Sequence, residues 1–215
     1  PTTRDNALDK AKFEVPAHRW MDLSEPAENG KPGRGLAIIN DCKYGHSCHS
    51  STMGLSLLRS PMWPDPTADR GTHEFTYSLM PHHGDWRAAG VDREAELMVR
   101  PMWAVPLNPG RQGTLGNSWA PFRLTGSAAI RIVAIKPPES GEPNKLIIRL
   151  VESHGRAGDC RIDWALPVTA IESVDLLEQA LPLSLNHNAS TRSTAFRIQP
   201  FQIVSLSVGL DAVHL

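Results

Sequence analysis

The segment AAIRIVAIKPPESGEPNKLIIRLVES, residues 128–153, decides the fold of the second half of the chain. Two runs rich in Ile, Leu and Val flank a cluster of Pro, Gly, Ser and Glu that cannot continue a strand. Apolar runs of this length, bounded by turn residues, are typical of paired β-strands. The segment therefore predicts a strand, a turn and a second strand.

Short runs of the same kind continue to the end of the chain. They are CRIDWALP (160–167), IESVDLL (171–177), TAFRIQP (194–200) and QIVSLSV (202–208). Turn clusters such as HGRAG separate them. Six strands at this spacing predict an antiparallel β-sandwich over residues 122–215.

The first half of the chain also shows the two-residue period of strands. The clearest case is THEFTYSLM (72–80), and shorter segments lie around Phe13–Val15, Leu36–Ile39 and Met53–Leu57. Residues 58–71 contain Pro61, Pro64 and Pro66, so they predict a loop that cannot carry a ladder of backbone hydrogen bonds. Residues 85–99 predict a helix, which Gly90 weakens in the middle.

Residues 106–121, PLNPGRQGTLGNSWAP, have no periodicity and are rich in Pro and Gly, which is typical of a linker. We therefore expect three parts: a β domain over 1–105, the linker over 106–121, and the sandwich over 122–215. The fold class is all-β.

Composition excludes several classes of partner. The chain has 215 residues, with 22 Lys and Arg against 23 Asp and Glu, a formal net charge of -1. Because the charges nearly cancel, no net electrostatic field of the whole chain attracts nucleic acid or anionic lipid. No apolar run is long enough to span a bilayer, and no signal-peptide core is present. Three sparse cysteines favour a reducing compartment, so we expect a cytoplasmic location and neither nucleic acid nor membrane as partner.

Common catalytic motifs are absent from the sequence. There is no Gly-rich phosphate loop, no G-x-S-x-G elbow and no H-E-x-x-H pair. The segment CKYGHSCH (42–49) contains zinc-type ligands, but Cys42, His46 and Cys48 share one strand face while His49 lies on the other, and no second ligand pair follows. A small metalloprotein site here is one hypothesis; buried Cys and exposed His are the simpler interpretation.

Histidines and carboxylates near the loops offer further candidates. His73, His82 and His83 lie close in sequence and are suited to acid–base chemistry near neutral pH. A His that alternates with Phe75 and Tyr77 on a strand, as His73 does, is more often a packed or hydrogen-bonded core residue, and that role is favoured. A pair of catalytic carboxylates is recognised by its separation in space, so Asp41, Asp65, Asp69 and Glu74 are candidates by loop position alone.

Several segments together resemble the C-terminal part of glycoside hydrolase family 38, the retaining α-mannosidases. In the first half these are HRWMDLSEP (18–26), GLAIINDCKYGHS (35–47) and LSLLRSPMWPDPTADRGTHEFTYSLMPHHGDW (55–86). In the second half they are residues 129–162, IESVDLLEQAL (171–181) and FRIQPFQIVSLSV (196–208). The resemblance covers nearly the whole chain.

The resemblance implies that residues 1–105 form the last portion of a β supersandwich (galactose mutarotase-like), and that a smaller sandwich follows. The family's catalytic Asp nucleophile and its zinc ligands belong to an N-terminal α/β barrel, which these residues do not include. We therefore expect no catalytic residue, cofactor or metal within this chain, and no hydrolysis by the chain alone. The partners implied are the upstream catalytic domain, an α-mannoside substrate and, through unpaired sheet edges, a homo-oligomer.

C-terminal loops of the family approach the barrel and help to shape the sugar site. By position, the NDCKYG turn and the proline-rich loop are the contributors expected here. The candidate substrate-binding residues are Asp41, Lys43, Tyr44, Asp65 and Arg70. The alternative is that NDCKYG is a tight turn in which Asn40 and Asp41 accept backbone amides and Gly45 supplies a positive φ.

The sequence departs from the family in two places, a longer hairpin tip at PAENGKPGRG (26–35) and His46 where Tyr is common. A different functional class also fits the composition. Trp63 or Trp119, if exposed, would stack on a sugar in a freestanding carbohydrate-binding β-sandwich module.

Overall fold

Antiparallel strands form the framework of both halves of the chain, which confirms the predicted all-β class. The computed structural model describes residues 6–106 and 116–211. The chain divides into two units, Pro1–Leu107 and Asn108–Leu215, which are considered separately. Most of the expected linker, residues 107–115, lies outside the described residues.

Unit 1 contains two three-stranded sheets. One has the order β1-β4-β5, with β1 (Val15–Pro16), β4 (Gly45–His49) and β5 (Thr52–Ser56). The other has the order β2-β3-β6, with β2 (Trp20–Ser24), β3 (Arg34–Asn40) and β6 (Tyr77–His83). Three helices accompany them: α1 (Ala7–Lys10), α2 (Trp86–Ala89) and α3 (Val91–Val99).

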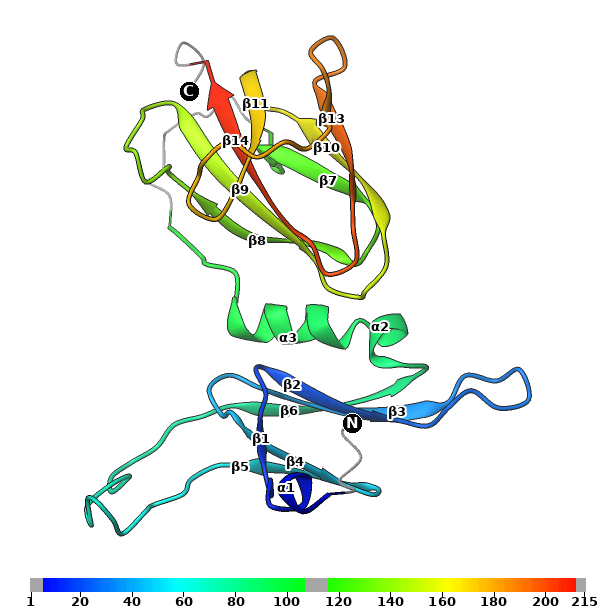
Figure 1. Cartoon of the computed structure of the whole chain (residues 1–215), viewed down its shortest axis with the longest axis vertical. Helices are drawn as coiled ribbons and strands as arrows, with labels where there is room; N and C mark the ends of the chain where they lie inside the picture. Colours follow the sequence, from blue (N-terminus) through cyan, green and yellow to red (C-terminus); the bar gives the residue numbers. More distant parts are fainter. Residues whose placement is uncertain (1–5, 107–115, 212–215) are drawn as a thin grey trace. The chain divides into compact units, whose positions relative to one another are not determined.

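Helices α2 and α3 cover one face of the β2-β3-β6 sheet, and the β1-β4-β5 sheet lies on the other side (Figure 1). The small side chains of Ala37 and Ala95 are fully buried, as is Val91, which allows α3 to pack closely on β3. Trp86 of α2 packs on Trp20 of β2, with ring centroids 4.9 Å apart. None of the helices among the described residues is long and apolar enough to cross a membrane.

The predicted helix over residues 85–99 is two helices. Gly90 adopts a left-handed conformation (φ 67°) that ends α2 and precedes α3. Asp85 caps α2 by accepting a hydrogen bond from the Ala88 N–H at 2.8 Å.

The strand predicted around THEFTYSLM is wrong at its start. β6 begins at Tyr77, because its partner β3 ends at Asn40 directly opposite, so residues 73–76 have no strand to pair with. β6 then continues through Pro81 to His83. Similarly, the Phe13–Val15 strand is reduced to Val15–Pro16, and Phe13 is exposed.

Unit 2 is a sandwich of two four-stranded sheets. The first has the order β12-β13-β10-β7, with β12 (Asn186–Asn188), β13 (Ser193–Ile198), β10 (Gly158–Trp164) and β7 (Phe122–Gly126). The second has the order β11-β14-β9-β8, with β11 (Val168–Val174), β14 (Ile203–Leu210), β9 (Lys145–Glu152) and β8 (Ile130–Lys136).

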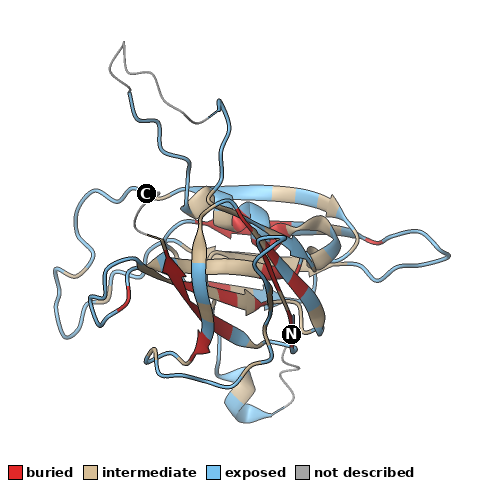
Figure 2. Ribbon diagram, turned by 90° about the horizontal axis from the view of Figure 1, so that it is seen from above, coloured by how far each residue is buried: buried red, intermediate tan, exposed pale blue. Residues whose placement is uncertain are grey.

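All six strands predicted for this unit are present, and β7 and β12 were not predicted. Alternate residues point between the sheets and form one apolar core, which includes Ile148, Leu150, Ile162, Ile198 and Leu206. Figure 2 shows buried residues mainly in strands, while the long loops are exposed. The period of two along each strand therefore builds the core.

Glu152, at the end of β9, is a fully buried carboxylate in this unit. It accepts hydrogen bonds from the N–H groups of His154 and Gly155 at 2.8 Å and of Phe201 at 2.9 Å. Burial raises the pKa of Glu152, but the hydrogen bonds from Phe201, His154, Arg156 and Gly155 together hold it below its usual value. The charged side chain joins the β9–β10 turn to the β13–β14 turn.

We predict that Glu152→Gln lowers the free energy of unfolding by about 2 kcal/mol at pH 7, because one acceptor oxygen becomes an amide that faces N–H groups. The folded-state pKa is lowered, so the stabilisation is present above the unfolded pKa of about 4.3 and is lost as pH falls through the folded value. Urea unfolding at pH 7 and below pH 4 measures both effects. Glu172→Gln, at an exposed position of β11, is the matched control; equal losses in the two variants would contradict the prediction.

Candidate functional site

The NDCKYG turn connects β3 to β4 through a buried amide. Asn40 is 1% exposed. Its Oδ1 accepts a hydrogen bond from the Lys43 N–H at 2.7 Å, and its Nδ2 lies 3.2 Å from Nε2 of His46. The amide therefore fixes both the turn and the first residues of the following strand.

His46 completes this network. Its Nδ1 lies 3.0 Å from the Tyr44 carbonyl oxygen, so Nδ1 carries the proton and Nε2 accepts from Asn40. Both ring nitrogens of the buried imidazole are occupied. Cys42 and Cys48 are exposed, and no group of three His, Cys, Asp or Glu side chains within the described ranges is arranged to hold a metal ion. The donor set at CKYGHSCH does not fit a metal site.

Asp41 joins the turn to the far end of the proline-rich loop. Its carboxylate accepts the Thr76 N–H at 3.0 Å, and its own N–H donates to the Thr76 carbonyl at 3.2 Å. Hydrogen bonds from the Cys42 thiol and from Thr76 lower the pKa of Asp41, and the same carboxylate raises the pKa of Cys42. Asp41 is therefore charged at neutral pH and also holds the loop.

Gly45 does not have the positive φ expected for it. It is the first residue of β4, where a Cβ atom would lie 3.0 Å from both the Glu14 carboxylate and the Ser56 Cβ. Close packing against these two side chains, and not a left-handed backbone, explains the glycine.

Lys43 and Tyr44 extend from the turn beside aromatic groups. The Lys43 ammonium lies 4.7 Å from the centroid of the Phe75 ring. Tyr44 is 56% exposed, and its ring meets the His18 ring edge-on at 5.1 Å. Lys43 is half-buried and Tyr44 is exposed.

The proline-rich loop is held by short-range polar contacts. Asp65 accepts the Thr67 N–H at 2.8 Å and its hydroxyl at 2.7 Å, which lowers the pKa of the Asp65 carboxyl. Asp69 accepts the Ser60 N–H at 3.0 Å, and the His73 ring donates to the Asp69 carbonyl at 2.8 Å. Arg70 is exposed.

An open groove of about 800 Å³ lies where the turn and this loop meet. Its lining includes Lys43 from the turn, Arg59, Asp69 and His73 from the loop, and Phe13 before β1. Of the five predicted residues, only Lys43 lines the groove; Asp41 and Tyr44 lie beside it in the turn, and Asp65 and Arg70 lie elsewhere in the loop. The sequence had indicated Asp69 as a candidate carboxylate and His73 as a candidate acid or base, but neither as a substrate-binding residue. Arg59 was not predicted.

The three neighbouring histidines have separate environments. His82 lies on β6, where Nε2 approaches Oδ1 of Asp22 at 2.7 Å, and Ser24 donates to the other oxygen of Asp22 at 2.6 Å. The His82 and Asp22 side chains are 4% and 7% exposed. Gly35 on β3 leaves room for the His82 ring, because a Cβ there would lie 2.2 Å from it. His82 is therefore packed. The packed core role had been favoured for His73, which alternates with Phe75 and Tyr77, and it is wrong there, because residues 73–76 form no strand and His73 is exposed.

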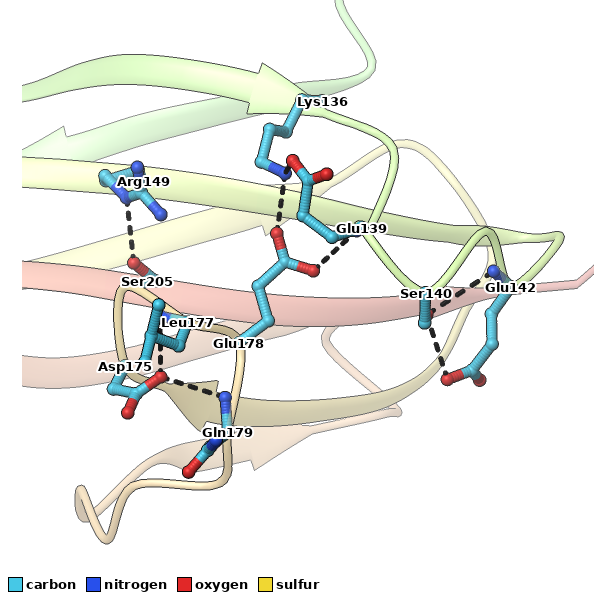
Figure 3. A network of polar contacts seen from close by, with 10 residues as sticks. All are labelled: Lys136, Glu139, Ser140, Glu142, Arg149, Asp175, Leu177, Glu178, Gln179 and Ser205. Atoms are coloured by element: carbon cyan, nitrogen blue, oxygen red, sulfur yellow. Dashed lines mark hydrogen bonds and ion pairs between the residues drawn. The ribbon is translucent and has the colours of Figure 1, made fainter.

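A second polar cluster lies in unit 2 (Figure 3). Glu178 pairs with the Lys136 ammonium at 2.6 Å and accepts the Glu139 N–H at 2.7 Å. Hydrogen bonds from Lys136 and Glu139 lower the pKa of Glu178, and those to Glu139 and Glu178 raise the pKa of Lys136. The Lys136 and Glu178 charges therefore neutralise each other. Because Glu178 follows β11 and contacts both Lys136 and the Glu139 N–H, the cluster links the connection after β8 to the connection after β11.

Comparison with known proteins identifies matches over both units. The family model for the glycosyl hydrolases family 38 C-terminal domain matches residues 1–67, and that for the family 38 C-terminal beta sandwich domain matches residues 129–206.

Individual relatives match along nearly the whole chain. Alpha-mannosidase 2C1 of Homo sapiens is 42% identical over 98% of this chain and 19% of its own length. Alpha-mannosidase G of Dictyostelium discoideum is 33% identical over 95% of this chain and 18% of its own length. Alpha-mannosidase of Saccharomyces cerevisiae is 32% identical over 95% of this chain and 20% of its own length. The chain spans about a fifth of the length of these curated relatives.

We predict that Asn40→Ala lowers the free energy of unfolding by about 1–3 kcal/mol, because it leaves the part-buried Lys43 N–H and the buried His46 Nε2 without partners. Urea unfolding followed by tryptophan fluorescence measures the change. Asn186→Ala, at an exposed position, is expected to cost less than about 0.5 kcal/mol. A neutral Asn40→Ala would show that the amide does not hold the turn.

Proposed function

Because this chain belongs to glycoside hydrolase family 38, in its C-terminal region, we propose that it is a non-catalytic β region of a longer α-mannosidase. The observation that carries the proposal is the alignment with alpha-mannosidases along 95–98% of the chain. The longer enzyme would hydrolyse terminal α-D-mannosyl residues of glycans with retention of configuration.

The catalytic groups are proposed to lie outside this chain. The resemblance implies a carboxylate nucleophile, a second carboxyl as acid and base, and zinc, all in an N-terminal barrel. Both ring nitrogens of the buried His46 are engaged, by Asn40 and Tyr44, and Nε2 of His82 is engaged by Asp22. The donor groups described do not fit zinc, so no step through the metal is derived from them.

The role proposed for unit 1 is to pack on the catalytic barrel and to complete its sugar cleft with the groove. Lys43 supplies a cation and hydrogen-bond donors at the groove, and Tyr44 supplies a half-exposed ring and a hydroxyl beside it. Asp41 and Asp65 are charged acceptors for sugar hydroxyls, since hydrogen bonds lower the pKa of each. Arg70 is an exposed donor on the same loop. A cytoplasmic location is proposed with this function.

A freestanding carbohydrate-binding module is the second candidate. It is favoured by the exposure of Trp63, 84% exposed, and of Trp119, 49% exposed, because a ring must be accessible to stack on a sugar. This function predicts saccharide affinity in the 215-residue chain alone, which titration of mannosides against tryptophan fluorescence would detect.

The first experiment compares hydrolysis of an aryl α-mannoside by the full-length protein and by the 215-residue chain, each with and without added zinc or cobalt. We expect hydrolysis only by the full-length protein. A rate from the 215-residue chain that titrates with metal and protein would contradict the placement of the catalytic groups.

We further predict that Lys43→Ala in the full-length protein lowers kcat/KM about tenfold, or about 1.4 kcal/mol of transition-state stabilisation, because a groove cation is lost. Lys10→Ala removes an exposed charge on α1 and serves as the control. Equal kcat/KM values for the two variants would remove Lys43 from the sugar site.

A further inference from the structure

The connection between β11 and β12, residues 175–185, uses its two charged side chains to hold its own backbone. Oδ1 of Asp175 accepts the Leu177 N–H at 2.8 Å and the Gln179 N–H at 2.9 Å. The Asp175 N–H in turn donates to the Gln179 carbonyl at 2.9 Å. The carboxylate therefore closes a tight loop over residues 175–179, as Asp side chains commonly do in turns.

This loop is anchored at its base and at its far side. At the base, the Leu181 N–H donates to the Ser173 carbonyl at 2.9 Å, and the Ser173 hydroxyl donates to the Leu181 carbonyl. On the far side, the Glu178 side chain is only 11% exposed, because it is paired with Lys136 in the cluster drawn in Figure 3. The path of the loop is thus fixed by hydrogen bonds and by one ion pair.

Two leucines are what the anchored loop presents to solvent. Leu176 is 59% exposed and Leu177 is 78% exposed. In most surface loops the polar side chains face water, whereas here both charged side chains are engaged and the two largest apolar ones point outward. The leucines cannot turn inward without breaking the hydrogen bonds that hold residues 175–179. A rigid pair of apolar side chains loses little conformational freedom on binding, so it is suited to docking.

The size of this leucine pair indicates what kind of surface it meets. A stable interface between separate proteins buries about 800 Å² on each partner, and two leucines on one turn supply only a small part of that area. A surface in the same polypeptide is present at high effective concentration, so a small contact is sufficient there. The pair therefore fits an intramolecular contact better than the association of two copies of the chain.

We infer that Leu176 and Leu177 dock into an apolar socket in the part of the longer polypeptide that lies outside this chain. The inference rests on the proposed function for the identity of that part. The aligned relatives have about four fifths of their length outside the matched region. The family model for the C-terminal beta sandwich domain, over residues 129–206, includes the loop.

The charge beside the leucines defines the rim of the socket. Glu139 and Glu178 share the single ammonium group of Lys136, which lies 2.6 Å from each carboxylate. One negative charge is left over, and the Glu139 side chain is 83% exposed. Because interfaces place opposite charges against each other, we expect a Lys or Arg at the rim of the socket.

The test measures whether residue 177 is accessible in the full-length protein and in the 215-residue chain. Leu177→Cys is introduced into both proteins, and the rate of labelling by N-ethylmaleimide is followed by mass spectrometry of the peptide that contains residue 177. We expect labelling to be at least tenfold slower in the full-length protein, because the socket covers the thiol. Ser190→Cys, at an exposed position after β12, is the control and is expected to label at the same rate in both proteins.

Two results would overturn the inference. Leu177→Cys that labels equally fast in both proteins has no socket, and labelling of the 215-residue chain that slows with protein concentration identifies a second copy as the partner. Mannoside hydrolysis by the same samples is an independent measurement. Hydrolysis with fast labelling rejects the docked leucines and keeps the proposed function, whereas slow labelling without hydrolysis does the reverse.

The double variant Leu176→Ala/Leu177→Ala supplies a second readout. Both side chains are exposed in this chain, so we expect an unchanged urea midpoint in the 215-residue chain and a lower midpoint in the full-length protein. Gln179→Ala shortens an exposed polar side chain of the same loop and keeps its backbone hydrogen bonds, so it is the matched control. Equal effects of the double variant in the two proteins would show that the leucines dock on nothing outside this chain.

Discussion

The connections of both units are built so that backbone N–H groups left unpaired by the strand ladders find acceptors. Where the strand ladders end, side chains take over: Glu152 accepts N–H groups from two turns, Asn40 accepts one in the β3–β4 turn, and Asp41 accepts one at the end of the proline-rich loop. Each of these side chains links segments that lie apart in sequence. The loops are ordered by a few specific hydrogen bonds, because they bury little apolar surface of their own.

These contacts also explain what could be predicted from the sequence. Period-two patterns identified the six strands of unit 2, because burial of alternate side chains between two sheets leaves a strong signal. The same period was misleading at residues 73–76, where strand formation depends on the length of β3, a distant partner. β2 was missed because its side chains are partly buried on both faces, so its burial does not alternate.

The groove was only partly predictable for a related reason. Lys43 was found through its turn, but its neighbours Arg59 and His73 come from opposite ends of a long loop. Their convergence depends on how the loop folds back, and local sequence does not encode that path. Gly45 shows the same limit: its role is set by Glu14 and Ser56, which no local pattern connects to it.

The clamp between Asp41 and Thr76 has a consequence for how this region can change over evolution. It pins the return of the proline-rich loop next to β3, while β5 fixes its departure, so the two ends stay in place whatever lies between them. Closing a flexible loop costs only about 0.6 kcal/mol more for each doubling of its length. Insertions and deletions within the loop are therefore cheap, and the sheets can be inherited unchanged while the loop varies in reach and composition.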